Sequence, residues 1–535
     1  MKKIPVLIIG AGPTGLTLAC ELAKRNITFR LVERSTEYPR GSRAKGVQPR
    51  SLEILNELGI AREAIEFGSL TLPFRRFKGN QALGDVQRPD FPRPDTQFTR
   101  GLIIPQWKIE ELLRAKLASF GVVPELGTEL LEFTQSETGV EAVLQKSGGP
   151  ETVACDWMVA CDGGKSNTRR ALQIAFAGET HEDERLLVGD VEVDGLTPDA
   201  WHVWPHPVYG FGLALCPFAH TKSWQIQAIA LPNERGHLPE PTLEVFNKLF
   251  QEFAQMPEVV LKNSTWQSLY RVNVRMAEKY RVGRVFIAGD AAHAHSIAGG
   301  LGMNTGIQDA FNLGWKLAAV VKGSAAPALL DTYEEERLPI AAWTLNISSS
   351  RQKAIMESKD QTGGGMAGTA TKDTTQLNLN YRYGSLSTEL TTPGQTPDPQ
   401  VRAGDRAPDA RLSDGTWLFD LHRGPQFTVF GTGQTAATLR QIDDHFAGQI
   451  KTHLLTDKAT IDAFTATAPD RDQPHTKIQQ ATETQPGSAT TQPGPETPDA
   501  IYVIRPDGYI GMIAGRNQRT AVIDWLSLFL KAGSR

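Results

Sequence analysis

The stretch that decides the fold is residues 4–15, which read IPVLIIGAGPTG. Its apolar run at 6–9 predicts a strand that is buried on both faces of a parallel sheet. The leucines that follow have helical spacing and predict a helix over 14–25. A second apolar run at 29–32 ends at Glu33 and predicts the next strand. Strand, glycine-rich turn, helix, strand and terminal acid in this order predict a dinucleotide-binding βαβ unit.

Each glycine of the first glycine turn, residues 10–15, has its own role in such a unit. Gly10 permits the tight turn, Gly12 lets the backbone approach a pyrophosphate, and Gly15 lets the helix pack closely on the strand. The free amides at the start of the helix favour the phosphate charge. Glu33 can accept hydrogen bonds from ribose hydroxyls. The turn alone does not distinguish FAD from NAD.

A second glycine turn, residues 289–304, lies about 280 residues downstream. It begins with Gly289-Asp290-Ala291-Ala292-His293, after an expected strand at 284–288, and leads into an expected helix at 305–321. A carboxylate at a strand end, followed by glycines and a helix start, forms a second element that can bind hydroxyls and anions. Because an extended two-part cofactor needs two such elements, the two turns are predicted to grip one nucleotide.

Three motifs make the chain resemble the single-component FAD-dependent aromatic hydroxylases, the group A flavin monooxygenases. They are GAGPTG at 10–15, Ala160-Cys161-Asp162-Gly163-Gly164 with Arg169-Arg170, and GDAAH at 289–293. The resemblance points to the branch of phenol hydroxylase, 3-(3-hydroxyphenyl)propionate hydroxylase and polyketide hydroxylases, and it covers nearly the whole chain. It implies an α/β protein with a Rossmann-like FAD-binding domain interleaved with an antiparallel-sheet substrate domain, plus a C-terminal thioredoxin-like domain.

The expected domain boundaries follow from this resemblance and from local composition. Two polar stretches, at 361–376 and 464–501, have too few large apolar residues to offset the entropy of ordering. No cysteine follows Cys216, so thiol chemistry is impossible in the C-terminal domain. The predicted parts are a discontinuous FAD-binding domain at 1–180 and 275–350, a substrate-binding antiparallel sheet at 181–274, a helix and linker at 351–399, and a C-terminal domain at 400–535 with a flexible insertion near 465–500.

The resemblance also assigns cofactor roles to residues that match the family's motifs. Asp290 is expected to bind the ribityl part of FAD. The helix that follows is expected to face the pyrimidine end of the flavin, because a positive helix end stabilises the anionic reduced ring. One departure is Ile297, where many relatives carry proline beside the flavin. The predicted cofactor-binding residues are Gly10, Gly12, Pro13, Thr14, Gly15, Glu33, Arg34, Arg43, Gln106, Leu130, Asp162, Asp290, Gly300, Gly302, Met303 and Asn304.

The reaction that the resemblance implies is a monooxygenation. NADPH or NADH reduces FAD, dioxygen adds to give a flavin C4a-hydroperoxide, and a phenolic ring attacks the distal oxygen. Water must be excluded, because the intermediate otherwise decays to hydrogen peroxide. No second Rossmann fingerprint occurs, which fits a nicotinamide cofactor that docks only transiently.

Substrate contacts are expected from a predicted antiparallel sheet. Between 185 and 232, apolar and polar residues alternate in several short strands. Because alternate side chains of a strand share a face, two pairs of residues are predicted to face the substrate. These predicted substrate residues are Tyr209, Phe211, Gln225 and Gln227.

Few side chains need to act in the chemistry, because the cofactor performs the difficult step. A base that removes the phenol proton would make the ring more nucleophilic. The predicted catalytic residues are His206, Tyr209 and His293, and His295 is a further candidate base. Lys45 stands where some phenol hydroxylases carry an acid, so that role does not carry over directly.

Composition limits the other classes of function. The chain has 535 residues and a formal net charge of -4, so it offers no general basic field for nucleic acid. No apolar run reaches the roughly 18 residues of a membrane span, and the four cysteines form no metal or dithiol motif. We therefore expect no metal, no nucleic acid and no membrane. We expect a cytoplasmic enzyme that meets a small aromatic substrate, O2 and NAD(P)H, with a homodimer as a further possibility.

Two alternative functions stay open. One is a flavin oxygenase that performs epoxidation or Baeyer–Villiger-type insertion on a polyketide or antibiotic. The other is a non-catalytic flavin-fold binding module. The intact glycines of both turns and Asp290 disfavour the binding module. Uptake of FAD tests the binding module, and analysis of the product separates the two oxygenases.

Overall fold

The computed structural model describes seven parts of the chain, and within them the chain forms two compact units. The first unit is Met1–Arg93 with Phe98–Leu377, and the second is Pro94–Gln97 with Asn378–Arg535. The second unit thus begins before the predicted boundary at 400. Ile297, most of the polar stretch at 361–376 and nearly all of the insertion near 465–500 lie outside the described residues. The described residues are 3–70, 72–232, 234–296, 300–357, 371–390, 401–465 and 499–532.

The first unit contains a seven-stranded sheet around β1. Three of its pairings, of β1 with β2, of β1 with β9 and of β9 with β16, are parallel. Val6, Leu7 and Ile8 are fully buried, as expected for a strand covered on both faces. The strands, in sheet order, are β15 (Arg281–Val282), β16 (Val285–Ile287), β9 (Gly149–Ala160), β1 (Ile4–Ile9) and β2 (Phe29–Val32), with β8 (Gly139–Lys146) joining β7 (Glu129–Ser136) to β9.

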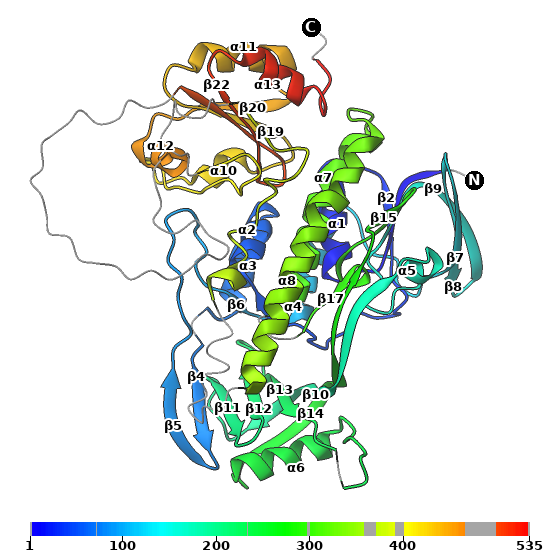
Figure 1. Ribbon diagram of the computed structural model, residues 1–535. Coiled ribbons are helices and arrows are strands. Elements are labelled where there is room, and N and C mark those ends of the chain that lie inside the picture. The colour runs from blue at the N-terminus through cyan, green and yellow to red at the C-terminus, as the bar shows by residue number, and fades with distance from the viewer. Residues whose placement is uncertain are drawn as a thin grey trace, which may run out of the picture. The chain divides into compact units, whose positions relative to one another are not determined.

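Helices of the first unit pack around this sheet (Figure 1). α1 and α7 begin within the two glycine turns and pack against each other, and α7 begins at Gly302, three residues before the expected start. Lys316 of α7 and Glu336 of α8 form a buried ion pair at 2.7 Å. The helices are α1 (Pro13–Ala23), α2 (Pro49–Glu57), α3 (Ala61–Phe67), α4 (Gln106–Ala118), α5 (Asn167–Ala171), α7 (Gly302–Val321) and α8 (Asp331–Glu357), with the short 3-10 turns η1 (Gly289–Ala291) and η2 (Pro327–Leu330).

An eight-stranded sheet forms the other part of the first unit. Its central strands are antiparallel, and β11 runs parallel to β4. One face is covered by α6 (Leu243–Ala254), whose Phe246 and Phe250 are fully buried. The strands, in sheet order, are β17 (His293–Ala294), β14 (Val260–Ala277), β10 (Phe176–Asp194), β13 (Ser223–Ile229), β12 (Gly210–Pro217), β11 (Trp201–His206), β4 (Phe74–Lys78) and β5 (Gln81–Val86).

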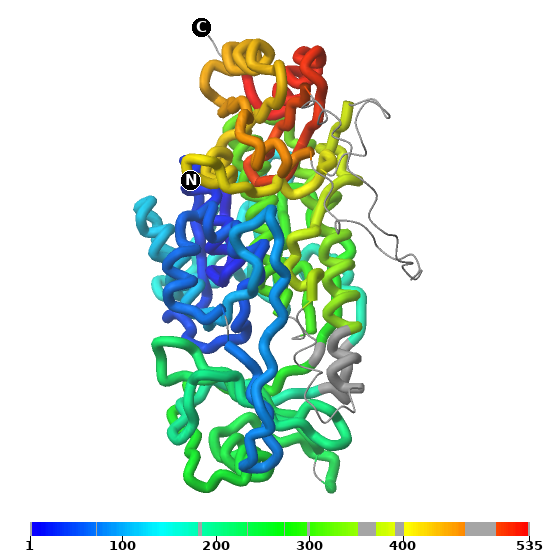
Figure 2. The backbone as a smooth tube through the Cα atoms, turned by 90° about the vertical axis from the view of Figure 1, so that its left-hand side faces the viewer, coloured from blue at the N-terminus to red at the C-terminus, as the bar shows by residue number. Residues whose placement is uncertain are grey.

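The eight-stranded sheet recruits chain from outside the predicted substrate domain at 181–274. The hairpin β4–β5 comes from the N-terminal part of the chain, and Figure 2 traces it in blue among the green strands. Short strands of this kind with exposed positions, such as Leu83, give little periodic signal in the sequence. The predicted mixed α/β class, with a parallel and an antiparallel sheet, is confirmed.

The second unit has its own sheet and core. β19 (Phe427–Gly431) and β20 (Ile450–Leu454) are parallel and are joined through α11 (Ala436–Phe446). β21 (Ala500–Ile504) and β22 (Ile510–Gly515) form an antiparallel pair, and β21 also pairs with β19. The other elements of the second unit are β18 (Thr388–Glu389), α10 (Leu418–His422), α12 (Lys458–Thr465) and α13 (Arg519–Leu526). The 3-10 turn η3 (Lys372–Thr375) belongs to the first unit.

Three further findings apply to the described residues. None of their helices is both long enough and apolar enough to cross a bilayer. No group of three or more His, Cys, Asp or Glu side chains among them could hold a metal ion. Cys20, Cys155, Cys161 and Cys216 are free thiols.

Candidate functional site

The two glycine turns meet in the first unit. Thr14, at the start of α1, packs against Gly289 and Gly306, where a Cβ would collide with the threonine hydroxyl. Gly289 also has a φ of +63°, a backbone conformation in which a side chain would be strained. Turns that are far apart in the sequence are therefore in contact, and both of them line one pocket.

Backbone contacts fix the first glycine turn. A Cβ at Gly10, whose φ is +98°, would collide with the carbonyl oxygen of Cys161 at the end of β9. A Cβ at Gly15 would collide with the carbonyl oxygen of Gly10. A Cβ at Gly12 would meet no atom within 4 Å, so this position leaves space for a ligand. The contacts agree with the three roles expected for these glycines.

A buried polar chain anchors the second glycine turn. Asp309 of α7 accepts a hydrogen bond from the Gly289 amide at 3.0 Å, and Arg337 of α8 donates to its other oxygen at 2.7 Å. His293 Nε2 lies 2.6 Å from the same carboxylate, and His293 Nδ1 lies 2.8 Å from His295 Nε2. Burial opposes ionisation of Asp309, but His293 and Arg337 outweigh it and hold the pKa of the carboxyl below its usual value. The turn is thus tied to two helices.

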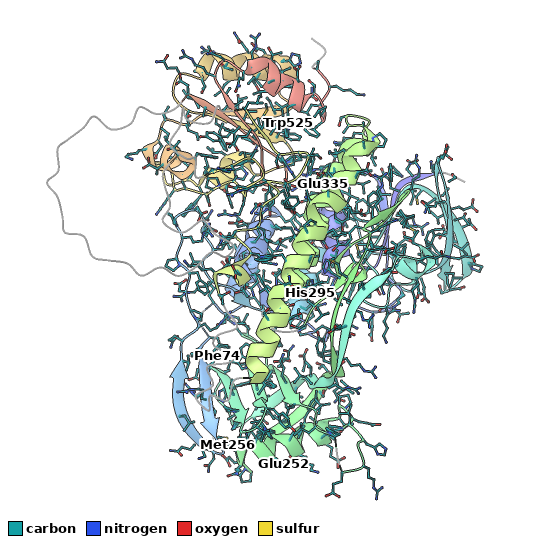
Figure 3. The ribbon with its side chains drawn as sticks, in the orientation of Figure 1. Phe74, Glu252, Met256, His295, Glu335 and Trp525 are labelled. Atoms are coloured by element: carbon teal, nitrogen blue, oxygen red, sulfur yellow. The ribbon has the colours of Figure 1, made fainter. Side chains whose placement is uncertain are left out.

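The pocket between the turns and the eight-stranded sheet has a volume of about 1320 Å³. Sites for one drug-sized ligand measure roughly 300–1,000 Å³, so this pocket has room for a dinucleotide and a second molecule. Figure 3 labels Phe74 on the eight-stranded sheet and His295 between that sheet and the seven-stranded one. Both residues line the pocket. The pocket therefore joins the seven-stranded and the eight-stranded sheets of the first unit.

Most of the predicted cofactor-binding residues line this pocket, and two do not. Gly15 lies behind the turn against Gly10. Asn304 is fully buried, and its amide donates to the carbonyl oxygens of Gly46 at 3.0 Å and Gly300 at 2.7 Å. Asn304 therefore orders the loop before α2. The predicted residues that line the pocket are Gly10, Gly12, Pro13, Thr14, Glu33, Arg34, Arg43, Gln106, Leu130, Asp162, Asp290, Gly300, Gly302 and Met303.

Several features at this end of the pocket fit FAD. Asp162 Oδ2 accepts hydrogen bonds from the amide and hydroxyl of Thr168, while its Oδ1 is buried without a hydrogen-bond partner among the described groups. An unpaired buried oxygen of this kind needs a donor, such as a ligand hydroxyl. α1 and α7 begin here without an acidic residue in their first turns, which leaves their amides available for anionic groups.

Asp290 opens onto the pocket from η1. Loss of solvent within the pocket raises the pKa of the Asp290 carboxyl, and the nearby His293 and Arg43 partly oppose this rise. A carboxylate in such a place gains from hydrogen bonds to hydroxyl groups. Asp290 thus remains the residue predicted to hold the ribityl chain.

Glu33 and Gln106 bond to the backbone of the pocket walls. Glu33 accepts hydrogen bonds from the amides of Ala11 at 2.9 Å and Ser35 at 3.0 Å. Gln106 accepts from the Ala44 amide at 3.1 Å and donates to Glu110 at 2.8 Å. Both side chains therefore shape the walls, and their contacts with the cofactor stay predictions.

One face of the eight-stranded sheet forms the opposite wall of the pocket. In adjacent strands, Cys216, Gln225 and Asp190 are direct cross-strand neighbours, and Gln227 and Val188 pair in another row on the same face. The aromatic side chains of this wall suit an aromatic ring. They are Phe74, Trp201, Phe211, Trp266 and Tyr270.

The predicted substrate and catalytic residues divide between this wall and other places. Phe211 and Gln227 line the pocket, and Gln225 lies just behind them with 1% of its surface exposed. Neither His206 nor Tyr209 is among the described residues that line the pocket, so the structure does not bring these two residues to the site.

Strand alternation fails for His206 and Tyr209 because they lie at the β11–β12 turn. His206 Nδ1 accepts hydrogen bonds from the amides of Val208 and Tyr209, and Tyr209 is 41% exposed on the surface. β12 begins only at Gly210, and the pairing of β11 with β12 shifts register next to Pro205. Tyr209 and Phe211 therefore do not share a face.

The structure separates the two histidines of the second turn. His293 is fully buried behind the pocket, between Asp309 and His295, so it positions its neighbour and does not reach the pocket. His295 lines the pocket, and burial together with His293 lowers its pKa well below the usual value. Its Nδ1 has no hydrogen-bond partner among the described groups. A neutral His295 in this place can accept a hydrogen bond.

Sequence reasoning missed Lys45 as a site residue. Lys45 lines the pocket, and its Nζ donates to Gln225 Oε1 at 2.5 Å and lies 4.5 Å from the centre of the Trp201 ring. These partners are more than 150 residues away in the sequence. The one signal in the sequence was that Lys45 stands where some phenol hydroxylases carry an acid, and that signal gave it no role.

Comparisons with known proteins agree on one family. The family model described as "FAD binding domain" matches residues 3–348, which include both glycine turns and the seven- and eight-stranded sheets. The chain is 39% identical over 446 residues to a flavin-dependent monooxygenase of Mycobacteroides abscessus, covering 82% of this chain and 90% of the relative. It is 35% identical over 457 residues to pentachlorophenol 4-monooxygenase of Sphingobium chlorophenolicum, covering 82% and 81%. A solved flavin-dependent monooxygenase, PieE in complex with FAD and substrate, has a TM-score of 0.80 at 20% identity and covers 98% of both chains.

Proposed function

Because this chain belongs to the FAD binding domain family and is an FAD-dependent monooxygenase like its relatives, we propose that it hydroxylates a phenolic or related aromatic substrate with NAD(P)H and O2. The observation that carries this proposal is the pocket in which both glycine turns face an aromatic wall. When bound, FAD supplies the activation of dioxygen, and the protein supplies position, charge and exclusion of water.

The residues of the chain divide this work between them. The turns at 10–15 and 289–304, with Asp162 and Asp290, would hold the cofactor. Phe211 and Gln227 of the sheet face would hold the substrate ring. Uptake of FAD is tested with Asp290→Ala, which we expect to weaken FAD affinity about 10- to 100-fold, the equivalent of one hydrogen bond to a charged group. Unchanged flavin content would count against the role of Asp290.

A second candidate function is oxygenation of a larger substrate, by epoxidation or Baeyer–Villiger-type insertion on a polyketide or antibiotic. The volume of about 1320 Å³ favours it, because a pocket of this size leaves room beyond a single phenol ring. The non-catalytic binding module has no such support, since the relatives are named as monooxygenases.

The test uses the FAD-loaded protein in air with NADPH or NADH and a panel of simple phenols and polycyclic phenols. We expect one class of substrate to accelerate nicotinamide oxidation and O2 uptake together, and mass spectrometry to show one added oxygen on the ring. An epoxide, or a ring enlarged by one oxygen, would favour the second candidate. A protein that takes up no FAD would contradict both.

Domain organisation and assembly stay proposals. The division at 180 and 275 is supported by the two sheets, although β4, β5 and β17 join the substrate sheet from outside it. A thioredoxin-like second unit is supported by the parallel β19–α11–β20 crossover followed by the antiparallel β21–β22 pair and α13. A homodimer, which light scattering would measure, and a cytoplasmic location both stay predictions.

A further inference from the structure

Lys45 is a cation on the pocket wall, and within the described parts of the chain it has no partner of opposite charge. Its Nζ donates to the neutral Gln225 and lies over the Trp201 ring, and no carboxylate among the described residues lies within 4 Å of it. Loss of solvent lowers the pKa of this amine from 10.5 to about 8, despite the opposing influence of Cys216 and Asp190. A half-buried ammonium without an anion beside it is costly to the fold. A ligand that brings an anionic oxygen would remove this cost.

The groups around Lys45 are arranged to leave this position open for such a ligand. The row of Cys216, Gln225 and Asp190 on three adjacent strands lies against the lysine. Gln225 is fixed in place, because its amide donates to the Ser42 carbonyl at 2.5 Å while its oxygen accepts from both Lys45 and Gln227. These contacts hold the ammonium against the wall that carries the aromatic side chains.

The neighbouring charges do not neutralise Lys45. The Asp190 carboxyl accepts from the Ser42 amide at 2.7 Å, and burial raises its pKa to about 6, so it is mostly ionised at neutral pH but forms no ion pair with Lys45. Burial also raises the pKa of Cys216 to about 11, so this thiol stays protonated at neutral pH. Arg88, which also lines the pocket, adds positive charge near Cys216. Because Lys45 lines the pocket and bonds only to the neutral Gln225 among the described residues, its ammonium can still form an ion pair with an anionic oxygen of a ligand.

We propose that Lys45 is a catalytic residue that binds and deprotonates the hydroxyl group of an aromatic substrate, a phenol or an enol, on the wall formed by Trp201 and Gln227. This inference rests on the proposed function. In the step, the substrate O–H bond breaks, its electron pair stays on the oxygen, and the proton forms an N–H bond on the neutral Nζ. The product is a phenolate paired with an ammonium, and no electrons are exchanged.

In water this proton transfer is uphill by about two pKa units, so attraction within the resulting ion pair must supply the difference. A phenol of tyrosine type has a pKa of about 10 in water. An amine with a pKa of about 8 is largely protonated at neutral pH, but a neutral fraction remains that can take the proton. The resulting ion pair is stabilised by the low polarity of the pocket, because Coulomb attraction strengthens where water is excluded. A phenolate also donates electron density to its ring more strongly than a phenol does. The ring carbon that attacks oxygen therefore becomes more nucleophilic.

The experiment measures binding of 4-nitrophenol and of its methyl ether, 4-nitroanisole, to the FAD-loaded enzyme by equilibrium dialysis, with the absorption of the bound probe as a second readout. The variants are Lys45→Met, Lys45→Arg and the control Lys222→Met, which changes an exposed lysine in the β12–β13 turn. We expect the wild type to prefer the phenol and to bind it as phenolate below the pKa of the free probe. We expect Lys45→Met to weaken phenol binding about 10- to 100-fold, the loss of a hydrogen bond to a charged group.

The remaining outcomes test whether the Lys45 ammonium itself causes the preference for the phenol. Lys45→Met should leave binding of the ether unchanged, Lys45→Arg should keep the preference for phenolate, and Lys222→Met should behave as the wild type. If Lys45→Met binds both probes as the wild type does, or if the wild type shows no preference for the phenol, the inference is wrong. A preference for 4-nitrobenzoate over 4-nitrophenol would also contradict the inference, because the group that Lys45 binds would then be the carboxylate of an aromatic acid. If no aromatic compound accelerates NAD(P)H oxidation by the wild type, the proposed function itself fails.

Thermal unfolding distinguishes this role from a structural one. Because the folded-state pKa of Lys45 lies below the unfolded value, the lysine's contribution to stability is fully present only above the unfolded pKa and is lost as the pH falls through about 8. Lys45→Met should therefore raise the Tm at neutral pH and raise it less at alkaline pH. A structural lysine would give the opposite result, a lower Tm on removal.

Discussion

The first glycine turn and the sheet face line the same pocket, yet they are held in different ways. Contacts of backbone atoms fix the turn, and contacts of side chains fix the sheet face. At the first glycine turn, backbone atoms decide the structure, since Gly10 and Gly15 allow contacts that no Cβ would permit. On the sheet face, side chains decide it, because Lys45, Gln225 and Asp190 connect a loop to two strands. The end of the pocket that backbone contacts fix tolerates few substitutions. At the end that side chains fix, substitutions can alter which ligand binds while the fold stays the same.

The largest effect is expected from Gly15→Ala at the backbone end. The new methyl group would overlap the Gly10 carbonyl oxygen, and no side-chain rotation relieves a collision with backbone. We expect loss of FAD binding and a destabilisation of at least about 1–3 kcal/mol, the usual cost of overpacking. Flavin absorption of the purified protein and its Tm measure both effects.

Gly148→Ala is the matched control. Gly148 lies between β8 and β9, and a Cβ there would meet no atom within 4 Å. We expect its stability to change by less than about 0.5 kcal/mol. Equal flavin content in both variants would show that the backbone does not decide this end of the pocket.

Asp309→Asn is expected to have a smaller effect on FAD binding than Gly15→Ala but a large effect on stability. It removes the anion that binds Arg337, His293 and the Gly289 amide in a fully buried place. Breaking a buried ion pair by removing one partner costs about 3–5 kcal/mol. Urea unfolding measures this loss, and Asp331→Asn, which affects an ion pair of 72% exposed Asp331 with Arg281, should cost only about 0–1 kcal/mol. Similar losses for both variants would contradict the anchoring role.

The same contrast explains how much of the site could be predicted from the sequence. The turns at 10–15 and 289–293 are local, because a short stretch of glycines sets the backbone path and the residue types alone indicate the ligand. The contacts of the sheet face join residues that are far apart in the sequence, because Lys45 meets Gln225 only once β13 has paired with β10. Tyr209 was misplaced for the same reason. Its neighbours alternate as in a strand, but the turn and the register shift before β12 remove it from that face.

Asp190→Asn tests the side-chain end through its dependence on pH. Burial raises the folded-state pKa of Asp190 from 3.8 to about 6, so the native state keeps a proton that the unfolded chain releases. The contribution of this carboxyl to stability is therefore fully present below about pH 4 and is lost as the pH rises through about 6. A shift of about two units corresponds to at most about 3 kcal/mol.

The asparagine variant removes this titration and keeps an oxygen that can accept from the Ser42 amide. We expect its Tm to exceed that of the wild type at about pH 8 and to show a smaller gain at about pH 4.5. A gain that does not change with pH would mean that the Asp190 carboxyl does not titrate in this range, and the charge pattern around Lys45 would need revision.

The smallest effect is expected from Tyr209→Ala, which compares the two sides of one hairpin. Tyr209 is 41% exposed and lies outside the described lining, whereas Phe211 is 5% exposed and lines the pocket. Tyr209→Ala should change stability by less than about 0.5 kcal/mol and leave the KM for an aromatic substrate unchanged. Phe211→Leu, which keeps most of the volume, should raise that KM by about 3- to 10-fold, the equivalent of roughly 1 kcal/mol of lost ring contact, with flavin content unchanged. If Tyr209→Ala lowers kcat while Phe211→Leu has no effect, the substrate meets the other side of the hairpin, and side chains on the exposed side must then move inward when it binds.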